Sequence, residues 1–178
     1  PSGQICGLRT AQACMAATVK KFLNLSRIER GNLEINRTEF SLWIDVFEPA
    51  VQTFAKQISD RGMTLVSQMD PAIRVNADQD LLQIVANNLI NNAAKYGIDQ
   101  GQIIVTARQD EKYVTVDVYN DGRPITAEQA SMLFKKFSRL DVPEKKLVKG
   151  SGLGLYITRQ IVESHGGTIK VEPKEHGN

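Results

Sequence analysis

Hydrophobic positions along the 178-residue chain follow two spacings, and each spacing predicts one kind of secondary structure. Apolar side chains at three- and four-residue intervals predict amphipathic helices, whereas alternation predicts strands with one buried face. The helical spacing predicts helices over residues 11–30, 42–59, 80–96, 127–137 and 152–164. The alternating spacing predicts strands over residues 33–35, 63–66, 73–75, 102–109, 112–119 and 168–171. Helices and strands interspersed in this way indicate a layered α+β fold, with antiparallel strands on one side and helices on the other.

Glycine and proline mark the boundaries of these elements. Gly31 and Gly97 follow the last residues of two helical patterns, as expected of helix stops. Pro49 is compatible with the 42–59 helix only near a first turn, because it has no N–H to donate. The 11–30 helix is long for a segment without a neighbour, so we expect it to pack on another helix of this chain or of a second copy. We therefore expect an N-terminal helix and junction over residues 1–31 and a domain over residues 32–178.

Composition narrows the range of partners. Lysine and arginine number 22 and aspartate and glutamate 20, so the net charge of +2 is too small to predict a nucleic-acid or anionic-membrane partner. No apolar run approaches the ~20 residues that a membrane span requires. Cys6 and Cys14 form neither a disulfide framework nor a metal-binding spacing, which favours a reduced, cytosolic context. Pro1 is not an initiator residue, so we expect a fragment of a longer protein.

The 80–96 helix carries an unusual run of asparagines. Asn88, Asn92 and Lys95 lie at i, i+4 and i+7 on one face, and Tyr96 lies at the border of the apolar stripe. Asparagine is a mediocre helix former, so its repeated use in a helix is unusual. Its carbonyl suits Mg²⁺, which takes few protein ligands and shares phosphate oxygens, and a lysine can bind the phosphate. A solvated helix face is the structural alternative.

Two glycine motifs follow. Gly122, in a loop directly after a strand, allows close backbone approach, although a plain turn explains this residue on its own. Gly150, Gly152 and Gly154 alternate at the start of the last helix, where uncovered amides and the helix dipole favour an anion. No strand leads into this motif and it lacks the lysine of a P-loop, so it predicts another kind of phosphate site.

Taken together, the three motifs resemble the ATP-binding domain of the GHKL superfamily, which includes sensor histidine kinases, type II topoisomerases, a heat-shock chaperone and mismatch-repair ATPases. Residues 133–140, Leu-Phe-Lys-Lys-Phe-Ser-Arg-Leu, resemble the phenylalanine box of histidine kinases. Residues 23–31 resemble the end of their second dimerisation helix and its junction to the catalytic domain. The resemblance runs from about residue 11 to residue 171. It implies a two-layer α/β sandwich, with a mixed, mostly antiparallel sheet against helices and part of a dimerisation helix at the N-terminus.

The resemblance also implies a site for ATP and Mg²⁺. Asn92 resembles the magnesium ligand, Asn88 the asparagine on the phosphate side, and Lys95 a phosphate contact. Arg139 resembles the arginine that reaches the terminal phosphate from a lid, so Asn88, Lys95 and Arg139 are implied to be catalytic. The resemblance places this lid over residues 140–149, and we expect the polar, lysine-rich segment 138–149 to be mobile without nucleotide.

On the adenine side, the resemblance places Tyr96 against the ribose or adenine, Asn120 at the adenine amine and Gly122 under the ring. Asn120 stands where the family usually has an aspartate, but its amide oxygen can still accept a hydrogen bond from the amine. The implied nucleotide-binding set is completed by Pro124, Ile125, Lys149, Gly150, Ser151, Gly152, Leu153, Gly154 and Leu155.

The family's phosphoacceptor motif, a histidine followed by an acid, Leu or Arg, Thr and Pro, is absent. The histidines here are His165 and His176, and His165 at a helix C-terminus favours a capping or packing role. Ile84, one turn before Asn88, has no group that activates water, which disfavours hydrolysis as the function.

We therefore predict the catalytic domain of a sensor histidine kinase, which binds ATP·Mg²⁺ but does not autophosphorylate alone. The longer protein would pass the γ-phosphoryl group to its own histidine and then to a response regulator receiver domain, as a homodimer through the N-terminal helix region. The resemblance implies no nucleic-acid partner and a cytoplasmic location, and leaves open an anchor in the inner membrane. The alternatives are a degenerate nucleotide-binding scaffold or regulatory module, for which Asn120 is the support, and a hydrolytic GHKL ATPase.

Overall fold

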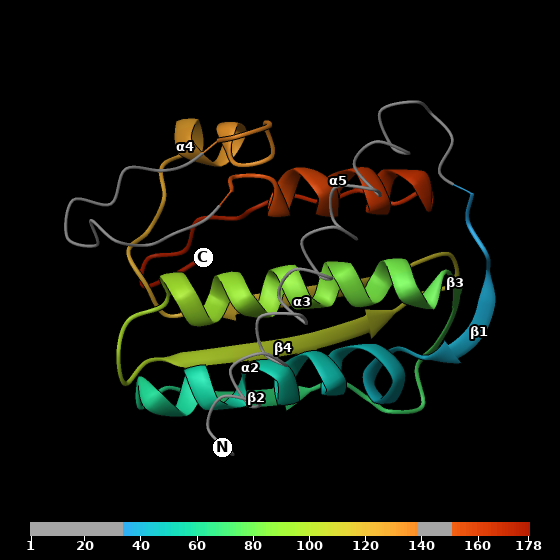
Figure 1. The fold of residues 1–178 in the computed structure, drawn as a ribbon, viewed down its shortest axis with the longest axis horizontal. Coiled ribbons are helices and arrows are strands. Elements are labelled where there is room, and N and C mark those ends of the chain that lie inside the picture. Colours follow the sequence, from blue (N-terminus) through green and yellow to red (C-terminus); the bar gives the residue numbers. More distant parts are fainter. Residues whose placement is uncertain (1–33, 139–150) are drawn as a thin grey trace, which may run out of the picture. The chain divides into compact units, whose positions relative to one another are not determined.

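The computed structural model describes residues 34–138 and 151–178 (Figure 1). The chain divides into two units, Pro1–Glu34 and Ile35–Asn178. The second unit contains every helix and strand of the described ranges. The predicted 11–30 helix, the predicted lid over residues 140–149, and the residues Arg139, Lys149 and Gly150 lie outside the described residues. The expectations stated for them stay predictions.

Short strands and helices are interspersed along the described chain, which confirms the α+β class. The elements are β1 (Thr38–Ser41), the π-helical turn η1 (Trp43–Phe47), α2 (Glu48–Asp60), β2 (Thr64–Gln68), β3 (Arg74–Ala77), α3 (Gln79–Tyr96), β4 (Gln102–Gln109), β5 (Val114–Asn120), α4 (Ala127–Met132) and α5 (Gly154–Ser164). None of the helices in these two ranges is long and apolar enough to cross a membrane.

The strands form two sheets. β1 and β3 are an antiparallel pair in which Thr38 lies opposite Ala77. In the other sheet β4 is central, parallel to β2 and antiparallel to β5. The hairpin predicted from the alternating pattern is confirmed, with Val105 opposite Val118. The sheet is therefore mixed, as expected.

Helix α3 lies between α2 and α5, over the three-stranded sheet (Figure 1). Ile90 of α3 and Ile103 of β4 have no exposed surface, and neither does Ile161 of α5. Burying each such side chain contributes roughly 1.5–3 kcal/mol. Ala86 and Ala94 are also fully buried, and their small side chains allow neighbouring elements to approach α3. This packing gives a fixed position to the helix that carries the asparagines.

Pro49 lies just after the π-helical turn that precedes α2. It has no N–H, so the regular bond to the carbonyl four residues earlier is missing. The N–H of the preceding residue, Glu48, donates to the carbonyl of Trp43, five residues back, and Pro49 falls in the first turn of α2. The constraint on Pro49 that the sequence indicated is thus confirmed.

Two predicted strands are wrong. Residues 34–37 have no regular structure, and the first strand, β1, begins at Thr38, where β3 offers a backbone partner. Residues 168–171 alternate in burial but form no strand, and among the described residues no backbone hydrogen bond joins them to one. Alternation reports a half-buried surface, whereas a strand also requires a neighbour.

The predicted 127–137 helix is shorter than expected. α4 ends at Met132, and Phe137 has a φ of 58°, which a right-handed helix does not accommodate. Its start is firmly defined, because Thr126 and Gln129 form a reciprocal capping box.

Candidate functional site

Asn88 connects α3 to the start of α5. Its side chain is buried, and its Nδ2 atom donates to the carbonyl oxygen of Gly154 (3.1 Å) and to Oγ1 of Thr158 (3.3 Å). A carbonyl only accepts, so the amide nitrogen must face Gly154, which leaves Oδ1 of Asn88 as an acceptor. The asparagine motif and the glycine-rich motif, 66 positions apart, are therefore brought together.

Asn92 lies one helical turn beyond Asn88. It is partly buried, and its side chain makes no hydrogen bond to another residue in the described part of the chain. Its amide oxygen is thus available on the same side of α3 as Asn88.

The segment before α5 depends on a glycine. Gly152 has a φ of +67°, and an added Cβ would lie 2.7 Å from the carbonyl carbon of Phe137. Leu153 anchors the segment in the core, and the hydroxyl of Ser151 accepts from its N–H (3.3 Å). Leu155 is partly buried in the first turn of the helix. Two small residues, Ser151 and Gly152, and the buried Leu153 therefore lead into the start of the helix, which lies next to Asn88.

The adenine-side residues meet at the other end of α3. A Cβ at Gly122 would lie 2.9 Å from Nδ2 of Asn120 and 3.3 Å from the carbonyl oxygen of Tyr96. Tyr96 is 44% exposed, and Nζ of Lys95 lies 4.9 Å from the centroid of its ring. Tyr96, Asn120 and Gly122 are thus neighbours, and the absence of a side chain at Gly122 lets the loop approach the helix.

Asp121 holds this loop, whereas Asn120 keeps its oxygen available. Oδ2 of Asp121 accepts from the N–H of Gln102 (2.7 Å), and Oδ1 accepts from the hydroxyl of Tyr119 (2.8 Å). That hydrogen bond raises the pKa of Tyr119, because ionisation would remove the donated proton and place a phenolate beside the carboxylate. Nδ2 of Asn120 donates to the carbonyl of Asp121 (3.2 Å), so its Oδ1 is the free acceptor of the pair.

Asn178 buttresses the same loop from the far end of the chain. Its backbone pairs with that of Asn120, and its side chain accepts from the N–H of Ile125 (2.9 Å) and donates to the carbonyl of Arg123 (2.9 Å). Pro124, between these two residues, is exposed. The sequence held no signal for the Asn178 contacts, because they join positions more than fifty residues apart.

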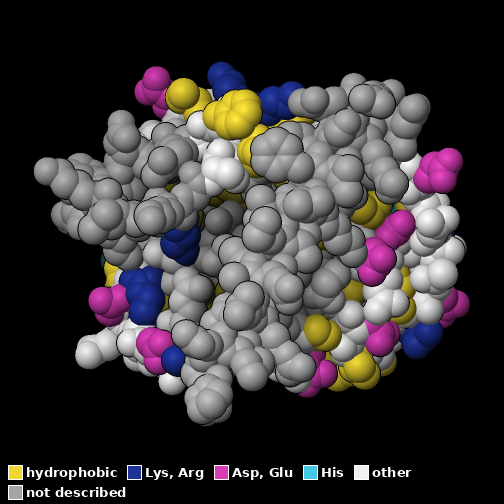
Figure 2. All heavy atoms as spheres, viewed as in Figure 1, with side chains coloured by type: hydrophobic (Ala, Val, Ile, Leu, Met, Phe, Trp, Pro, Cys, Tyr) yellow, Lys and Arg dark blue, Asp and Glu magenta, His cyan; other side chains and the backbone are white. Residues whose placement is uncertain are grey.

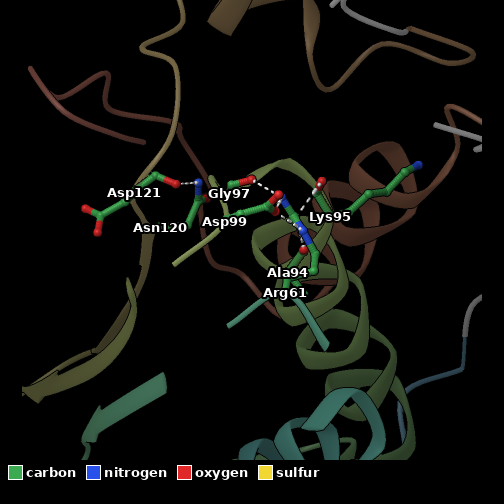
Figure 3. A network of polar contacts seen from close by, with 7 residues as sticks. All are labelled: Arg61, Ala94, Lys95, Gly97, Asp99, Asn120 and Asp121. Atoms are coloured by element: carbon green, nitrogen blue, oxygen red, sulfur yellow. Dashed lines mark hydrogen bonds and ion pairs between the residues drawn. The ribbon is translucent and has the colours of Figure 1, made fainter. Parts of the chain in front are cut away.

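Arg61 is the other contributor that sequence reasoning missed. The pattern around it predicts only the end of a helix, but its guanidinium donates to the carbonyls of Ala94, Lys95 and Gly97 at the C-terminus of α3 (Figure 3). Its position directly after α2 gave no indication of a partner more than thirty residues away.

The donor set limits the kind of metal that the site can hold. Across residues 34–138 and 151–178, no group of three His, Cys, Asp or Glu side chains could bind a metal ion. A divalent ion here would be held by the amide oxygens of Asn88 or Asn92 and by phosphate oxygens. That combination fits Mg²⁺ carried by a nucleotide, and it does not fit a free-standing metal centre.

Charges on the visible surface are mixed. On the face seen in Figure 2, neither basic nor acidic side chains of the described residues gather into a continuous patch.

Comparisons with known proteins agree with this geometry. A family model described as "Histidine kinase-, DNA gyrase B-, and HSP90-like ATPase" matches residues 77–178, more than half of the chain. The solved nucleotide-free catalytic domain of the histidine kinase ThkA is 30% identical, with a TM-score of 0.71 over 80% of this chain and 90% of that chain. ThkA in complex with the response regulator TrrA also matches, at 25% identity and a TM-score of 0.67 over 92% of this chain and 46% of that chain.

Curated relatives point to the same group. The probable sensor kinase SilS of Salmonella typhimurium is 29% identical over 91% of this chain and 33% of its own length. The sensor protein VanS of Enterococcus faecium is 29% identical over 89% of this chain and 41% of its own length. The chain thus spans less than half the length of these two relatives. It belongs to the family of histidine kinase-, DNA gyrase B- and HSP90-like ATPases, as a nucleotide-binding domain of the histidine kinase catalytic type.

Proposed function

We propose that this chain is the catalytic part of a sensor histidine kinase. The longer protein transfers the γ-phosphoryl group of ATP to a ring nitrogen of its own histidine, which leaves ADP, and then to an aspartate of a response regulator. The observation that carries the proposal is the hydrogen bond from Asn88 to Gly154, because it joins the asparagine helix to a helix start suited to phosphates. Family membership and the ThkA–TrrA complex support it.

On the phosphate side, Asn92 holds Mg²⁺ through its amide oxygen, and Asn88 offers Oδ1 beside it. When bound, the ion neutralises charge on the phosphates as the phosphoryl group is transferred. Lys95 contacts a phosphate, and Arg139 and Lys149 add positive charge from the lid. The backbone amides of residues 150–155 cradle the phosphate oxygens at the N-terminus of α5.

On the adenine side, Asn120 accepts from the adenine amine through its free Oδ1. Gly122 lies beneath the base, Tyr96 packs against the base or the ribose, and Pro124 and Ile125 border the ring. A neutral amide in place of a carboxylate accepts a weaker hydrogen bond, so affinity for adenine is reduced but retained.

We further propose that the N-terminal helix region dimerises in the longer protein and that the domain works in the cytoplasm. The response regulator is the partner that receives the phosphoryl group. The similarity of this chain to ThkA in its complex with the response regulator TrrA supports a response regulator as the partner.

Titration calorimetry with a nonhydrolysable ATP analogue tests the proposal. The wild-type chain should bind the analogue with Mg²⁺, and Asn92→Ala should weaken that binding about 10- to 100-fold without changing the melting temperature. Asn76→Ala is the matched control, since this asparagine lies exposed on β3 and should leave binding unchanged.

Two results would contradict the proposal. Absence of analogue binding by the folded chain would favour a scaffold, and rapid release of phosphate from ATP would favour a hydrolytic ATPase. A radiolabel assay should show no phosphohistidine on this chain alone, since neither His165 nor His176 lies in an acceptor motif.

A further inference from the structure

We propose that Arg61 is a positioning residue for the adenine side of the nucleotide site. It does not touch the base, and acts by fixing the last turn of α3, against which the Asn120–Gly122 loop is built. This inference rests on the proposed nucleotide site.

The contacts of Arg61 converge on a helix terminus. Nη1 donates to the carbonyls of Ala94 (2.5 Å) and Lys95 (3.2 Å), and Nη2 donates to that of Gly97 (2.8 Å), as Figure 3 shows. The last carbonyls of a helix have no partner within the helix, and a cation is favourable at this negative end of the dipole. Arg61 therefore supplies hydrogen bonds and charge where α3 would otherwise fray.

The arginine is itself held in place. Its side chain is only 19% exposed and pairs with the carboxylate of Asp99, to which Nε donates at 2.7 Å. Its own carbonyl accepts from the N–H of Gln100 (3.0 Å). Arg61 thus clamps both the end of α3 and the turn after it.

The clamped turn lies directly against the adenine-side loop. The N–H of Ile98 donates to the carbonyl of Asp121 (2.9 Å). A Cβ at Gly97 would lie 3.3 Å from that same carbonyl and 2.8 Å from the carbonyl of Ala93, so backbone meets backbone here. A shift of the turn would therefore shift Asp121, and with it Asn120 and Gly122.

The phosphate side is held differently. Asn88 and Asn92 lie further back along α3, and Asn88 is bonded to α5. Lys95, the remaining proposed phosphate contact on α3, does lie in the turn that Arg61 holds. Loss of Arg61 should therefore weaken contacts to the base more than contacts to the phosphates. A purely structural role would reduce both together.

Competition against a fluorescent ATP analogue, with Mg²⁺ present, distinguishes a positioning role on the adenine side from a purely structural role. AMP reports the adenine side and tripolyphosphate reports the phosphate side. We expect Arg61→Ala to weaken the binding of AMP at least fivefold and the binding of tripolyphosphate less than twofold. Arg61→Lys, which keeps the charge but not the planar set of donors, should fall between wild type and Arg61→Ala for AMP.

Arg74→Ala is the matched control, because Arg74 forms an exposed ion pair with Glu39 on the small sheet. This variant should leave the dissociation constants of AMP and of tripolyphosphate unchanged. Should Arg61→Ala not fold, Arg61→Lys provides the same test. In that variant the binding of AMP should weaken at least twofold more than the binding of tripolyphosphate. Equal weakening of both ligands, or no weakening of AMP, in the folded variant overturns the inference. Absence of analogue binding by wild type would instead overturn the proposed function.

Discussion

The two ends of α3 are held by different chemistry. At the N-terminus the buried carboxylate of Asp78 accepts from the N–H groups of Leu81 (3.0 Å) and Asn36 (3.0 Å). At the C-terminus the Arg61 guanidinium donates to carbonyls of the last turn. Each end therefore has the charge that opposes the helix dipole.

The two ends also connect α3 to different neighbours. The N–H of Asp78 donates to Nε2 of His165 (3.1 Å), which ties the N-terminus to the end of α5. The C-terminal turn is tied to Asp121 through Ile98. We infer that one end of α3 places the helix that presents the glycine-rich segment and that the other end places the adenine loop.

Asp78→Ala is expected to have the largest effect on stability. It removes a helix cap and leaves the N–H groups of Leu81 and Asn36 without their acceptor. The free energy of unfolding should fall by about 2–3 kcal/mol, measured by urea denaturation. Asp78→Asn keeps the capping oxygen for Leu81 but turns an NH2 group toward the N–H of Asn36, so it should lose less than Asp78→Ala, about 1–2 kcal/mol. Equal losses for both variants would show that the cap is not the cause.

Gly97→Ala tests the opposite end by crowding it. The added methyl would meet the side chain of Met63 and lie 2.8 Å from the carbonyl of Ala93, which cannot yield without moving the helix end. Overpacking of this kind costs about 1–3 kcal/mol. In Gly154→Ala the added methyl would come no closer than 3.5 Å to Asn88, so this variant should be at least as stable as wild type in the same measurement. A Gly97→Ala protein with the same free energy of unfolding as wild type would contradict the tight fit between the turn after α3 and the Asn120–Gly122 loop.

His165→Ala sharpens the comparison at the N-terminal end. Because the N–H of Asp78 is a donor, Nε2 of His165 must accept, and Nδ1 donates to the carbonyl of Ile161 (2.8 Å). Loss of the imidazole should cost about 1 kcal/mol in thermal or urea unfolding. The exposed His176 is the control, and its replacement by alanine should cost nothing measurable. Equal effects of the two variants would argue against the link between α3 and α5.

Tyr119 gives the smallest expected effect, at the C-terminal side. Its bond to Asp121 raises its pKa, so it contributes stability below the unfolded pKa of about 10. That contribution is lost as pH rises through the folded pKa. The free energy of unfolding should therefore decline above about pH 10. In Tyr119→Phe the decline should be smaller, and an unchanged pH profile would contradict this role.

Much of the fold was predictable because its signals are local. The limits of α3 agree with the pattern to within one residue, and those of β4 are the predicted ones. The strands predicted at 33–35 and 168–171 failed because alternation cannot show whether a partner strand lies alongside. The motifs around Asn88, Gly122 and Gly152 were visible in the sequence, since each is a short run of unusual residues.

By itself, the sequence determined which residues are equipped for nucleotide chemistry: amide oxygens on one helix face and glycines at a helix start. Spacing along a helix or strand depends only on neighbouring residues, so these features follow from the chain itself. Only the tertiary structure decided that Asn88 would bond Gly154 and that Arg61 would hold the end of α3. These contacts join positions 66 and 33 residues apart. Which carbonyl a buried donor reaches is settled by the packing of helices against the sheet, and no local pattern encodes it.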